Sequence, residues 1–464
     1  MPRRRPRPND LGLLAAAAAI VAVLSGCASE PRVAPQVGRV REPPEIVGRR
    51  GPLTRAEVAS VEQRLAASPG DDILLRRHLA VEQAVAETPL LDGEATRVLH
   101  DGPTSLRAIF AAIAAARREV DLEYYIFDDV RSDGVGLGDL LIDKRRQGVA
   151  VNVIYDAYGS GPTPPALFDR LRRAGVGLVE FNPMNPAKAK AGYAPNARDH
   201  RKILIADDAV AIVGGVNLDH AYETAADKAV TGTTGLRWRD TDLEIRGPAA
   251  LRLHDLFADH WREQHGPPLA NDDPHVAARA AGDSVVRVIG SSPRKTIPRY
   301  YVTLISAIRS AERRVSISTA YFVPTRDEIE ALADAARRGV EVRLMLPDQS
   351  DSALALAVGR SHYGELLKAG VKIYELHGLI LHSKTASVDG VWSVIGSSNL
   401  DHRSVIFNDE VDVVVIGARA ADELDAQFDD DRRQARAVDL AAWRRRPLRE
   451  RLSEAYGRLW QALL

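Results

Sequence analysis

The sequence predicts an α/β protein in which one α-β-α domain is built twice. Patterns typical of strands alternate with patterns typical of helices from about residue 89 onward, which favours mixed, mostly parallel sheets with helices on both faces. A 21-residue segment at 200–220 recurs without a gap at 382–402. Because the recurring positions are mainly polar, we expect one chemical site at the pseudo-twofold interface between the domains.

The first domain is predicted over residues 89–268. A helix at 105–118 comes first, and the next two helices end at glycines that suit a C-cap. The strands are expected at 120–127, 149–157 and 176–181, and the glycines are Gly148 and Gly175. The loop 183–199, which leads into the repeated segment, has no counterpart of equal length in the second half. The sequence leaves open whether this loop is a lid or a spacer.

The second domain is predicted over residues 283–464, after a boundary rich in Gly, Pro, Asn and Asp at 264–282. Its strands are expected at 315–323, 341–347 and 372–376, with Gly339 and Gly370 at the C-caps. At the C-terminus, residues 448–464 place leucines at helical spacing beside arginines. We expect this helix to dock on the second domain, and the alternative is an interfacial membrane helix.

The first 27 residues are predicted to be an export signal. A basic run precedes fourteen mainly apolar residues at 11–24, fewer than the roughly 20 that span a bilayer as a helix. The ending Leu24-Ser25-Gly26-Cys27 resembles the lipobox of bacterial lipoproteins, which implies a lipid on Cys27. An ordinary signal peptide with an incidental cysteine is the alternative. Ala28 follows the cysteine where Asp would retain a lipoprotein in the inner membrane, so a lipid-anchored protein of the outer membrane, facing the periplasm, is expected.

Residues 28–53 are predicted to be a tether, because they are rich in Pro, Arg and Glu and lack apolar periodicity. Residues 54–88 are predicted to form a helical prelude, which begins with a capping box at 54–57. A net charge of −1 provides no general basic field, so nucleic acid is not an expected partner. The single cysteine excludes an internal disulfide, and we expect a monomer.

The repeated segment keeps its polar positions while its apolar positions vary. Ile203 corresponds to Thr385, for example, and Val210 to Trp392. The identical pairs are His200/His382, Lys202/Lys384, Asp207/Asp389, Gly214/Gly396, Asn217/Asn399, Leu218/Leu400, Asp219/Asp401 and His220/His402. A repeat that only maintained a core would instead preserve its apolar residues. The pattern therefore indicates that the repeated polar residues form a chemical site rather than part of the core.

The chemistry that these residue types favour is phosphoryl transfer. On a strand, His and Lys two positions apart point to the same face. Two such strands would direct two imidazoles and two ammonium groups into one pocket, and Asn217 and Asn399 would add amide donors after glycine turns. Cations stabilise the negative charge that grows in the transition state. Two imidazoles with an unperturbed pKa of ~6.5 can act as nucleophile and as acid at neutral pH.

These features resemble the phospholipase D superfamily, whose signature is two HxKxxxxD motifs, each followed by Gly and Asn. The resemblance covers about residues 90–464. Four segments are similar to bacterial cardiolipin synthases: YYIF at 124–127, RDTDLEIRGP at 239–248, AYFVP at 320–324 and GSSNLDHRSVIFNDE at 396–410. The chain departs from that branch in one respect, because a lipoprotein signal stands where that branch has a pair of transmembrane helices.

The resemblance implies a two-step reaction through a covalent phosphohistidine, without a metal or another cofactor. His200 is expected to be the nucleophile and His382 the acid and base. The phosphate-binding residues implied are Lys202, Lys384, Asn217 and Asn399. Glu410 is expected to orient His382, with Asp240 as its counterpart in the first domain. Asp207 and Asp389 are expected to be structural, and His220 and His402 to pack or form hydrogen bonds.

Several functions share these residues. Phosphatidyl transfer, with phosphatidylglycerol as donor and acceptor, is favoured by the cardiolipin synthase-like segments. Hydrolysis of phospholipids to phosphatidic acid differs only in that water, rather than an alcohol, reaches the intermediate, and a motif does not decide between them. An exported phosphodiesterase or nuclease is disfavoured by the near-neutral charge and the predicted anchor. An inactive envelope scaffold is disfavoured by two complete motifs.

Overall fold

The computed structural model describes most of the chain after residue 44. The described residues are 45–48, 51–66, 71–85, 88–185, 187, 193–194, 196–224, 237–269, 280–293 and 298–461. The predicted signal peptide, Cys27, the tether as far as residue 44 and part of the loop 183–199 therefore lie outside the described residues. Within the described part, no helix is both long and apolar enough to cross a bilayer.

The first domain is a mixed half-sheet with a parallel outer part and an antiparallel inner part. The parallel strands are β4 (Glu119–Tyr124), β7 (Ala150–Asp156) and β8 (Gly177–Phe181). The antiparallel strands continue from β4 through β10 (Lys202–Ala206), β11 (Val210–Gly214), β13 (Asp242–Arg246) and β3 (Leu90–Leu99). One face packs on α4 (Gly102–Ala115), α5 (Leu137–Arg146) and α6 (Pro165–Arg173), and the other on α7 (Pro248–Glu263).

The second domain repeats this arrangement. Its parallel strands are β15 (Arg314–Thr319), β17 (Glu341–Pro347) and β18 (Lys372–Leu376). Its antiparallel strands continue from β15 through β20 (Lys384–Val388), β21 (Trp392–Gly396), β23 (Asn408–Ile416) and β14 (Ser284–Ser291), and β24 (Ala435–Ala437) pairs with β18. Its helices are α8 (Arg299–Ser310), α9 (Arg326–Arg337), α10 (Ala353–Ala369) and, on the opposite face, α12 (Ala418–Gln434).

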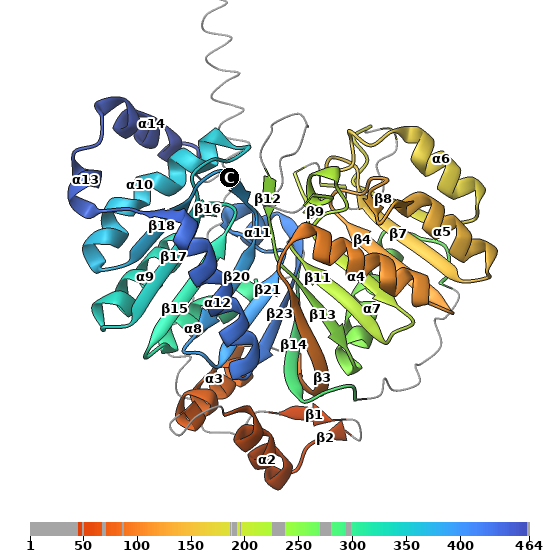
Figure 1. Cartoon of the computed structure of the whole chain (residues 1–464), viewed down its shortest axis with the longest axis horizontal. Helices are drawn as coiled ribbons and strands as arrows, with labels where there is room; N and C mark the ends of the chain where they lie inside the picture. The colour runs from red at the N-terminus through yellow and green to blue at the C-terminus, as the bar shows by residue number, and fades with distance from the viewer. Residues whose placement is uncertain are drawn as a thin grey trace, which may run out of the picture. The chain divides into compact units, whose positions relative to one another are not determined.

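The two half-sheets are joined by β3 and β14, which pair antiparallel with Leu91 opposite Val286. Figure 1 shows these two strands between the halves. The pairing places α7 and α12 over one shared apolar cluster, in which Leu253 and Phe257 lie with Leu424. The predicted α/β fold, with its domain built twice, is confirmed, and the halves share one core.

The prediction that residues 28–53 form a tether is wrong at the C-terminal end of this segment. β1 (Ile46–Gly48) pairs parallel with β3 and antiparallel with β2 (Gly51–Pro52). Ile46 is almost completely buried. Three strand residues are too short a run to show periodicity, and their burial depends on β3, which is distant in the sequence.

The predicted prelude helices are α2 (Arg55–Leu65), which begins with the expected capping box, and α3 (Asp71–Val85). They pack on the second domain, because Leu75 and Leu79 of α3 share a core with Tyr301 and Trp392. The terminal helices are α13 (Leu440–Arg444) and α14 (Leu448–Arg458). α14 docks beside α10 as predicted, but it does so through Glu454 and Gly457 rather than through its leucines.

Candidate active site

His200 and His382 line the same cavity, which has a volume of about 500 Å³. The two residues are separated by 182 positions in the chain and come from different domains. Aromatic and aliphatic side chains form much of the cavity wall: Tyr125, Tyr158, Trp238, Tyr321, Val323 and Ala355. The central expectation from the sequence, that both imidazoles meet in one pocket, is confirmed.

The backbone of each motif histidine is held by the opposite domain. β9 (Arg198–Asp199) runs into His200 and pairs parallel with the start of β23, so that the His200 N–H donates to the carbonyl of Asp409 at 2.9 Å. β12 (Arg237–Arg239) pairs parallel with β19 (Leu379–Leu381), and the His382 N–H donates to the carbonyl of Arg239 at 2.8 Å. Each half therefore completes the other.

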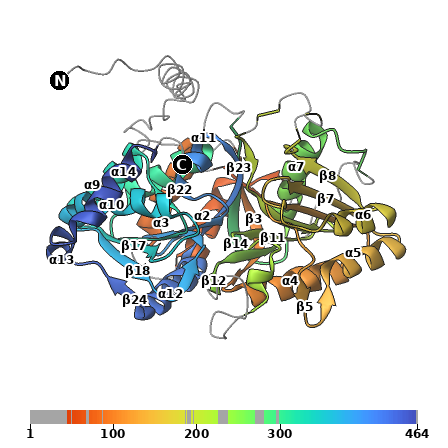
Figure 2. The same ribbon diagram turned by 90° about the horizontal axis from the view of Figure 1, so that it is seen from above.

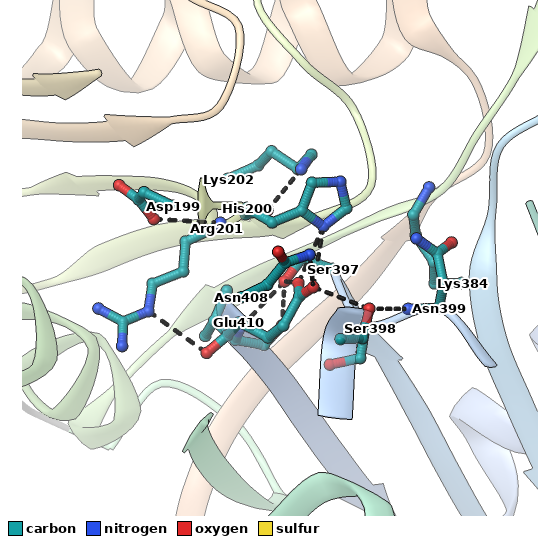
Figure 3. Close-up of polar contacts among 12 residues, drawn as sticks. Asp199, His200, Arg201, Lys202, Lys384, Ser397, Ser398, Asn399, Asn408 and Glu410 are labelled. Carbon is teal, nitrogen blue, oxygen red and sulfur yellow. Dashed lines mark hydrogen bonds and ion pairs between the residues drawn. The ribbon is translucent and has the colours of Figure 1, made fainter. Parts of the chain in front are cut away.

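The carboxylates that orient the imidazoles are also exchanged between the domains. His200 Nδ1 lies 3.0 Å from Glu410 Oε2, and His382 Nδ1 lies 2.6 Å from Asp240 Oδ2. Figure 3 shows the His200 ring directed at Glu410, with Lys384 and Asn399 on the far side. The sequence-based assignment of Glu410 to His382 is therefore wrong. Its counterpart Asp240 likewise serves the histidine of the other domain, because β23 and β12 reach across the interface.

A hydroxyl group at equivalent positions supports each carboxylate. Asp219 caps the short helix η3 (His220–Tyr222), and Tyr222 Oη donates to Asp240 Oδ2 at 2.9 Å. In the second domain, an aspartate caps α11 (His402–Ile406), and Ser404 Oγ donates to Glu410 Oε1 at 2.9 Å. Tyr222 and Ser404 both lie three residues after the capping aspartate. The long tyrosine reaches a short carboxylate side chain, whereas the short serine meets a long one.

Further polar groups surround Glu410. Ser397 Oγ donates to Oε2 at 2.5 Å, and Asn408 Nδ2 donates to Oε1 at 3.1 Å. Sequence reasoning did not identify these residues, Ser404 or Tyr222. Tyr222 and Ser404 lie two positions past the end of the repeated segment and differ in type, so a search for identities passes over them.

The site holds its carboxylates charged and its histidines neutral. Burial lowers the pKa of His200 to about 4, with Lys202 adding to the effect against the opposing charge of Glu410. Burial and Lys384 likewise lower the pKa of His382. For Glu410, burial acts in the raising direction, but His200, Lys202 and Ser397 together outweigh it and lower the pKa. A neutral imidazole with Nδ1 directed at a carboxylate keeps Nε2 available as a base or nucleophile.

The motif lysines are buried behind the histidines and are not among the residues that line the cavity. Lys202 Nζ and Lys384 Nζ donate to the carbonyl oxygens of His200 and His382, respectively. Burial lowers the pKa of Lys202 to about 7 and that of Lys384 to about 8. An anion in the cavity would raise both values, because it would offset the cost of burying the ammonium groups.

The two motif asparagines do line the cavity, as predicted. Asn217 Oδ1 accepts from the backbone N–H of Ile126 at 3.2 Å, which leaves its Nδ2 group to donate to a ligand. The glycines before the asparagines are required by close packing. A Cβ at Gly215 would collide with the Asp240 carboxylate, and one at Gly396 would collide with Asp412.

The motif aspartates are structural, as expected. Both adopt positive φ, 55° at Asp207 and 57° at Asp389, and both accept backbone N–H groups. The donors are Arg117, Arg118 and Glu119 for Asp207, and Glu312, Arg313 and Arg314 for Asp389. His220 and His402 form hydrogen bonds, as predicted: His220 Nδ1 lies 2.7 Å from Glu223, and His402 Nδ1 donates to the carbonyl of Val323 at 3.3 Å.

Two buried groups of side chains near the site have the composition of a cation site: Glu119, Asp121 and His254, and Glu123, Asp199 and His260. Neither group lines the cavity. In the first group, Asn152 Nδ2 donates to both carboxylates, and in the second, the Arg201 guanidinium donates to Glu123 at 3.1 Å. These contacts tie α7 and the β9–β10 region to the sheet.

Comparison with known proteins identifies the family. A family described as cardiolipin synthase, phospholipase D-like domain, matches residues 109–228 and 304–432, one stretch in each domain. A cardiolipin synthase of Geobacillus kaustophilus is 35% identical over 409 residues, which cover 87% of this chain and 78% of the relative. The chain belongs to this family. The predicted membership of the phospholipase D superfamily, on its cardiolipin synthase branch, is therefore confirmed.

A second relative agrees with the family assignment, and a solved structure shares the fold. A cardiolipin synthase of Alkalihalophilus pseudofirmus is 33% identical over 408 residues, or 87% of this chain and 78% of the relative. The crystal structure of the phosphatidylserine synthase of Haemophilus influenzae superposes with a TM-score of 0.62, and covers 84% of this chain and 100% of the other. At 12% identity, this second likeness shows a shared fold alone.

Proposed function

We propose that this family member transfers a phosphatidyl group from one phosphatidylglycerol molecule to another, which yields cardiolipin and glycerol. One observation carries the proposal: two neutral imidazoles, each oriented through Nδ1 by a carboxylate of the opposite domain, share one cavity. The relative from Geobacillus kaustophilus, 35% identical over most of both chains, is named a cardiolipin synthase and supports the choice of substrate.

In the proposed first step, His382 is an imidazolium that gains its second proton as the anionic phosphate binds. His200 Nε2 attacks the phosphorus, the P–O bond to glycerol breaks, and His382 Nε2–H donates its proton to the departing glycerol oxygen, which leaves His382 neutral. In the second step, neutral His382 accepts the proton of the incoming hydroxyl, whose oxygen attacks phosphorus and breaks the P–N bond. The 2.6 Å contact of His382 with Asp240 favours it as the group that becomes positively charged. His200, whose Nδ1 lies farther from its carboxylate partner, at 3.0 Å from Glu410, is the proposed nucleophile.

The charge on the phosphorane is proposed to be balanced by the chain's own cations. Lys202 and Lys384 lie directly behind the histidines, and Asn217 and Asn399 donate from the cavity wall. Such fixed donors stabilise growing negative charge without a metal ion. Activity should therefore persist when EDTA is present throughout the assay. Loss of activity in EDTA that returns with a divalent cation would contradict this part of the proposal.

A lipid alcohol is favoured over water as the acceptor because the cavity offers a place for a second phosphate. Arg198 and Arg403 line the same cavity as the histidines. Arg403 donates to the Oδ1 and carbonyl oxygens of Asn196, which fixes its guanidinium beside the cavity. An acceptor phosphatidylglycerol carries its own phosphodiester, which these cations would bind.

The experiment that tests the proposal is incubation of the purified protein with phosphatidylglycerol vesicles, followed by separation of the lipids and assay of glycerol. Cardiolipin and glycerol in equal amounts are expected. Phosphatidic acid as the main lipid product would show hydrolysis instead, and no lipid product together with cleavage of DNA would show a nuclease. His200→Ala and His382→Ala are the matched controls and should each remove the activity.

We further propose that Cys27 is lipidated and anchors a monomer to the envelope, on the side of the outer membrane that faces the periplasm in a host that has one. The motif Leu24-Ser25-Gly26-Cys27 supports this proposal. Radioactive palmitate should label the mature protein but not the Cys27→Ser variant, and the variant should be recovered in the soluble periplasmic fraction. Equal labelling of both proteins would contradict it.

A further inference from the structure

The exposed apolar side chains of this protein are concentrated at its C-terminus. Among the described residues, large hydrophobic side chains are exposed at nine positions, and five of these lie between 448 and 460. They are Leu448, Leu452, Tyr456, Leu459 and Trp460, and Leu459 is 78% exposed. A cluster of this many exposed apolar side chains on one helix marks an interaction surface.

These side chains form one stripe along α14 and the turn that follows it. At about 100° per residue, Leu448, Leu452, Tyr456 and Leu459 fall within one face of roughly 80°. The opposite face, which contains Glu454 and Gly457, packs on the domain, and Arg446 pairs with Glu454. The stripe is therefore not the docking face of the helix.

Cations border the stripe on both sides. Arg449 and Arg451 are exposed, and their positions in the helix flank the leucines. Arg444 and Arg445, at the end of α13, are exposed immediately before α14. The exposed acid of α14, Glu450, lies away from the stripe, toward the packed side. An apolar face bordered by arginines is the composition of a helix that lies in the interface of an anionic bilayer.

The packed face of α14 lies close to residues that line the active-site cavity. Gln461 Nε2 donates to the carbonyl of Pro324 at 2.9 Å, and the preceding residue, Val323, lines the cavity. On α10, Ala355 lines the cavity, while Ala357 and Val358 lie against Gly457 of α14. Figure 1 shows α14 beside α10 at the upper left, and Figure 2 shows the same two helices side by side from above.

We propose that α14 docks on the surface of an anionic phospholipid bilayer, with its leucines among the acyl chains and its arginines at the phosphates. The arginines select this occupant over a second copy of the chain, because two copies meeting through this face would bring their cations together. Docking here would bring the part of the molecule that carries α14, and the cavity close to it, to the lipid surface. The benefit to catalysis rests on the proposed function, but the binding itself is measurable without turnover.

The test uses the full-length chain carrying Cys27→Ser, so that no lipid anchor forms, and His200→Ala, so that no lipid is consumed. Co-sedimentation is measured with vesicles of phosphatidylglycerol and phosphatidylcholine, and with phosphatidylcholine alone. The stripe variant is Leu452→Glu with Leu459→Glu. The matched control is Ile73→Glu, because Ile73 of α3 is also well exposed, at 66%, but lies on the prelude. The melting temperature of each variant is measured first, and only variants that melt at the same temperature as the unsubstituted protein are compared.

The unsubstituted stripe should bind the anionic vesicles, and the double variant should bind them at least about tenfold more weakly, since each leucine loses much of its apolar contact with lipid. The double variant Arg449→Glu with Arg451→Glu should bind the vesicles that contain phosphatidylglycerol more weakly, and its binding to phosphatidylcholine vesicles should not change. Ile73→Glu should bind like the unsubstituted protein. Equal vesicle binding by the stripe variant and the Ile73 control would overturn the proposal. It would also be overturned if the unsubstituted protein were a dimer in solution and the stripe variant a monomer, with no difference in vesicle binding.

An activity measurement separates this inference from the proposed function. With His200 restored, the stripe variant should lose activity on vesicles in proportion to its lost binding, while it retains full activity on a monomeric short-chain phosphatidylglycerol. Absence of any lipid product from both substrates would refute the proposed function and leave the vesicle-binding result standing.

Discussion

His200 and His382 occupy the same position in the two copies of the motif, and they differ in what surrounds Nδ1. Nδ1 of His200 lies within hydrogen-bond distance of Glu410, whereas Nδ1 of His382 lies within that distance of Asp240, Tyr222 and Lys384. Two copies of one motif therefore create two different environments. This difference is the basis on which we propose separate roles for them as nucleophile and as acid.

The crossed pairing predicts which variants share a kinetic defect when phosphatidylglycerol is compared with the p-nitrophenyl ester of phosphatidic acid. A leaving group as good as p-nitrophenol needs no acid, so loss of His382 or Asp240 should slow this substrate far less than phosphatidylglycerol. His200→Ala and Glu410→Gln should slow both substrates, by about 10²-fold or more. First-turnover rates of leaving-group release by the four variants on the two substrates test this, because the second step needs His382 with either substrate. Grouping of Glu410 with His382 would restore the within-domain pairing that the structure contradicts.

The pH dependence of kcat/KM follows from the lowered pKa values. His200 is neutral above a pKa of about 4, so the acid limb should lie near there instead of at the ordinary histidine value of 6.5. Lys202 is charged only below a pKa of about 7, so phosphate binding and kcat/KM should fall as the pH rises above about 7. Calorimetric titration with inorganic phosphate should show the same weakening. A kcat/KM that rises through pH 6.5 would contradict this account.

At the residue scale, the sequence identified the residues that the two copies share, but it did not predict which carboxylate contacts which histidine. His200, Lys202 and Asn217 and their partners in the second half were found because they are identical. The partner of Glu410 could not be read from spacing, because the crossing depends on β9 and β23 meeting across the interface. Tyr222 was missed because its counterpart has a different side chain.

At the scale of elements, each copy of the motif runs into a short helix that its own aspartate caps. The cap fixes the residue three positions later, where Tyr222 and Ser404 donate to Asp240 and Glu410. The strand, the glycine turn and the capped helix thus act together. One unit of structure delivers a histidine to the opposite domain and a hydroxyl to its own carboxylate.

Removal of these hydroxyls should weaken the orientation of the histidines. Tyr222→Phe keeps the ring and deletes one hydrogen bond to a charged carboxylate, which is worth about 1.5–3 kcal/mol, so kcat should fall by roughly 10- to 100-fold. Because the bond acts on His382, the loss should be small for a p-nitrophenol leaving group. Ser404→Ala should instead affect both substrates. Identical profiles for the two variants would count against the assigned roles.

The boundaries of some repeated strands could be predicted well, whereas β4 and β15 end at Tyr124 and Thr319, before the expected residues 127 and 323. Residues 341–347 and 372–376 are β17 and β18 as expected, because both are apolar runs that follow a glycine C-cap. β1 was missed because Ile46 is buried by partners far along the chain. The orientation of α14 was also unexpected, since a leucine stripe ordinarily marks the buried face.

At the scale of the molecule, the prelude belongs to the second domain. His78 Nε2 of α3 lies 3.1 Å from Asp389 Oδ2, and both side chains are fully buried. A structural aspartate of the motif is therefore fixed by a helix that comes before both domains. The chain order of the prelude gave no sign of which half it would cover.

Breaking this contact should destabilise the fold. His78→Ala removes the side-chain partner of the buried Asp389 carboxylate, which keeps only its backbone N–H donors, and we expect the free energy of unfolding to fall by about 3 kcal/mol. Arg76→Ala on the same helix removes an ion pair from a 61% exposed arginine and should cost less than about 1 kcal/mol. Urea unfolding monitored by circular dichroism compares the two. Equal losses would show that the prelude is not anchored through Asp389.

The central claim is that two domains build one site in which His200 carries the phosphatidyl group and His382 transfers protons. The most direct measurement is rapid mixing of His382→Ala with the p-nitrophenyl ester of phosphatidic acid, followed by mass spectrometry. We predict a burst of about one p-nitrophenol per chain, because the adduct forms but no base activates the acceptor, and a phosphatidyl group on His200 that acid releases and base does not. A burst with the adduct on another residue, or no burst at all, would contradict the account.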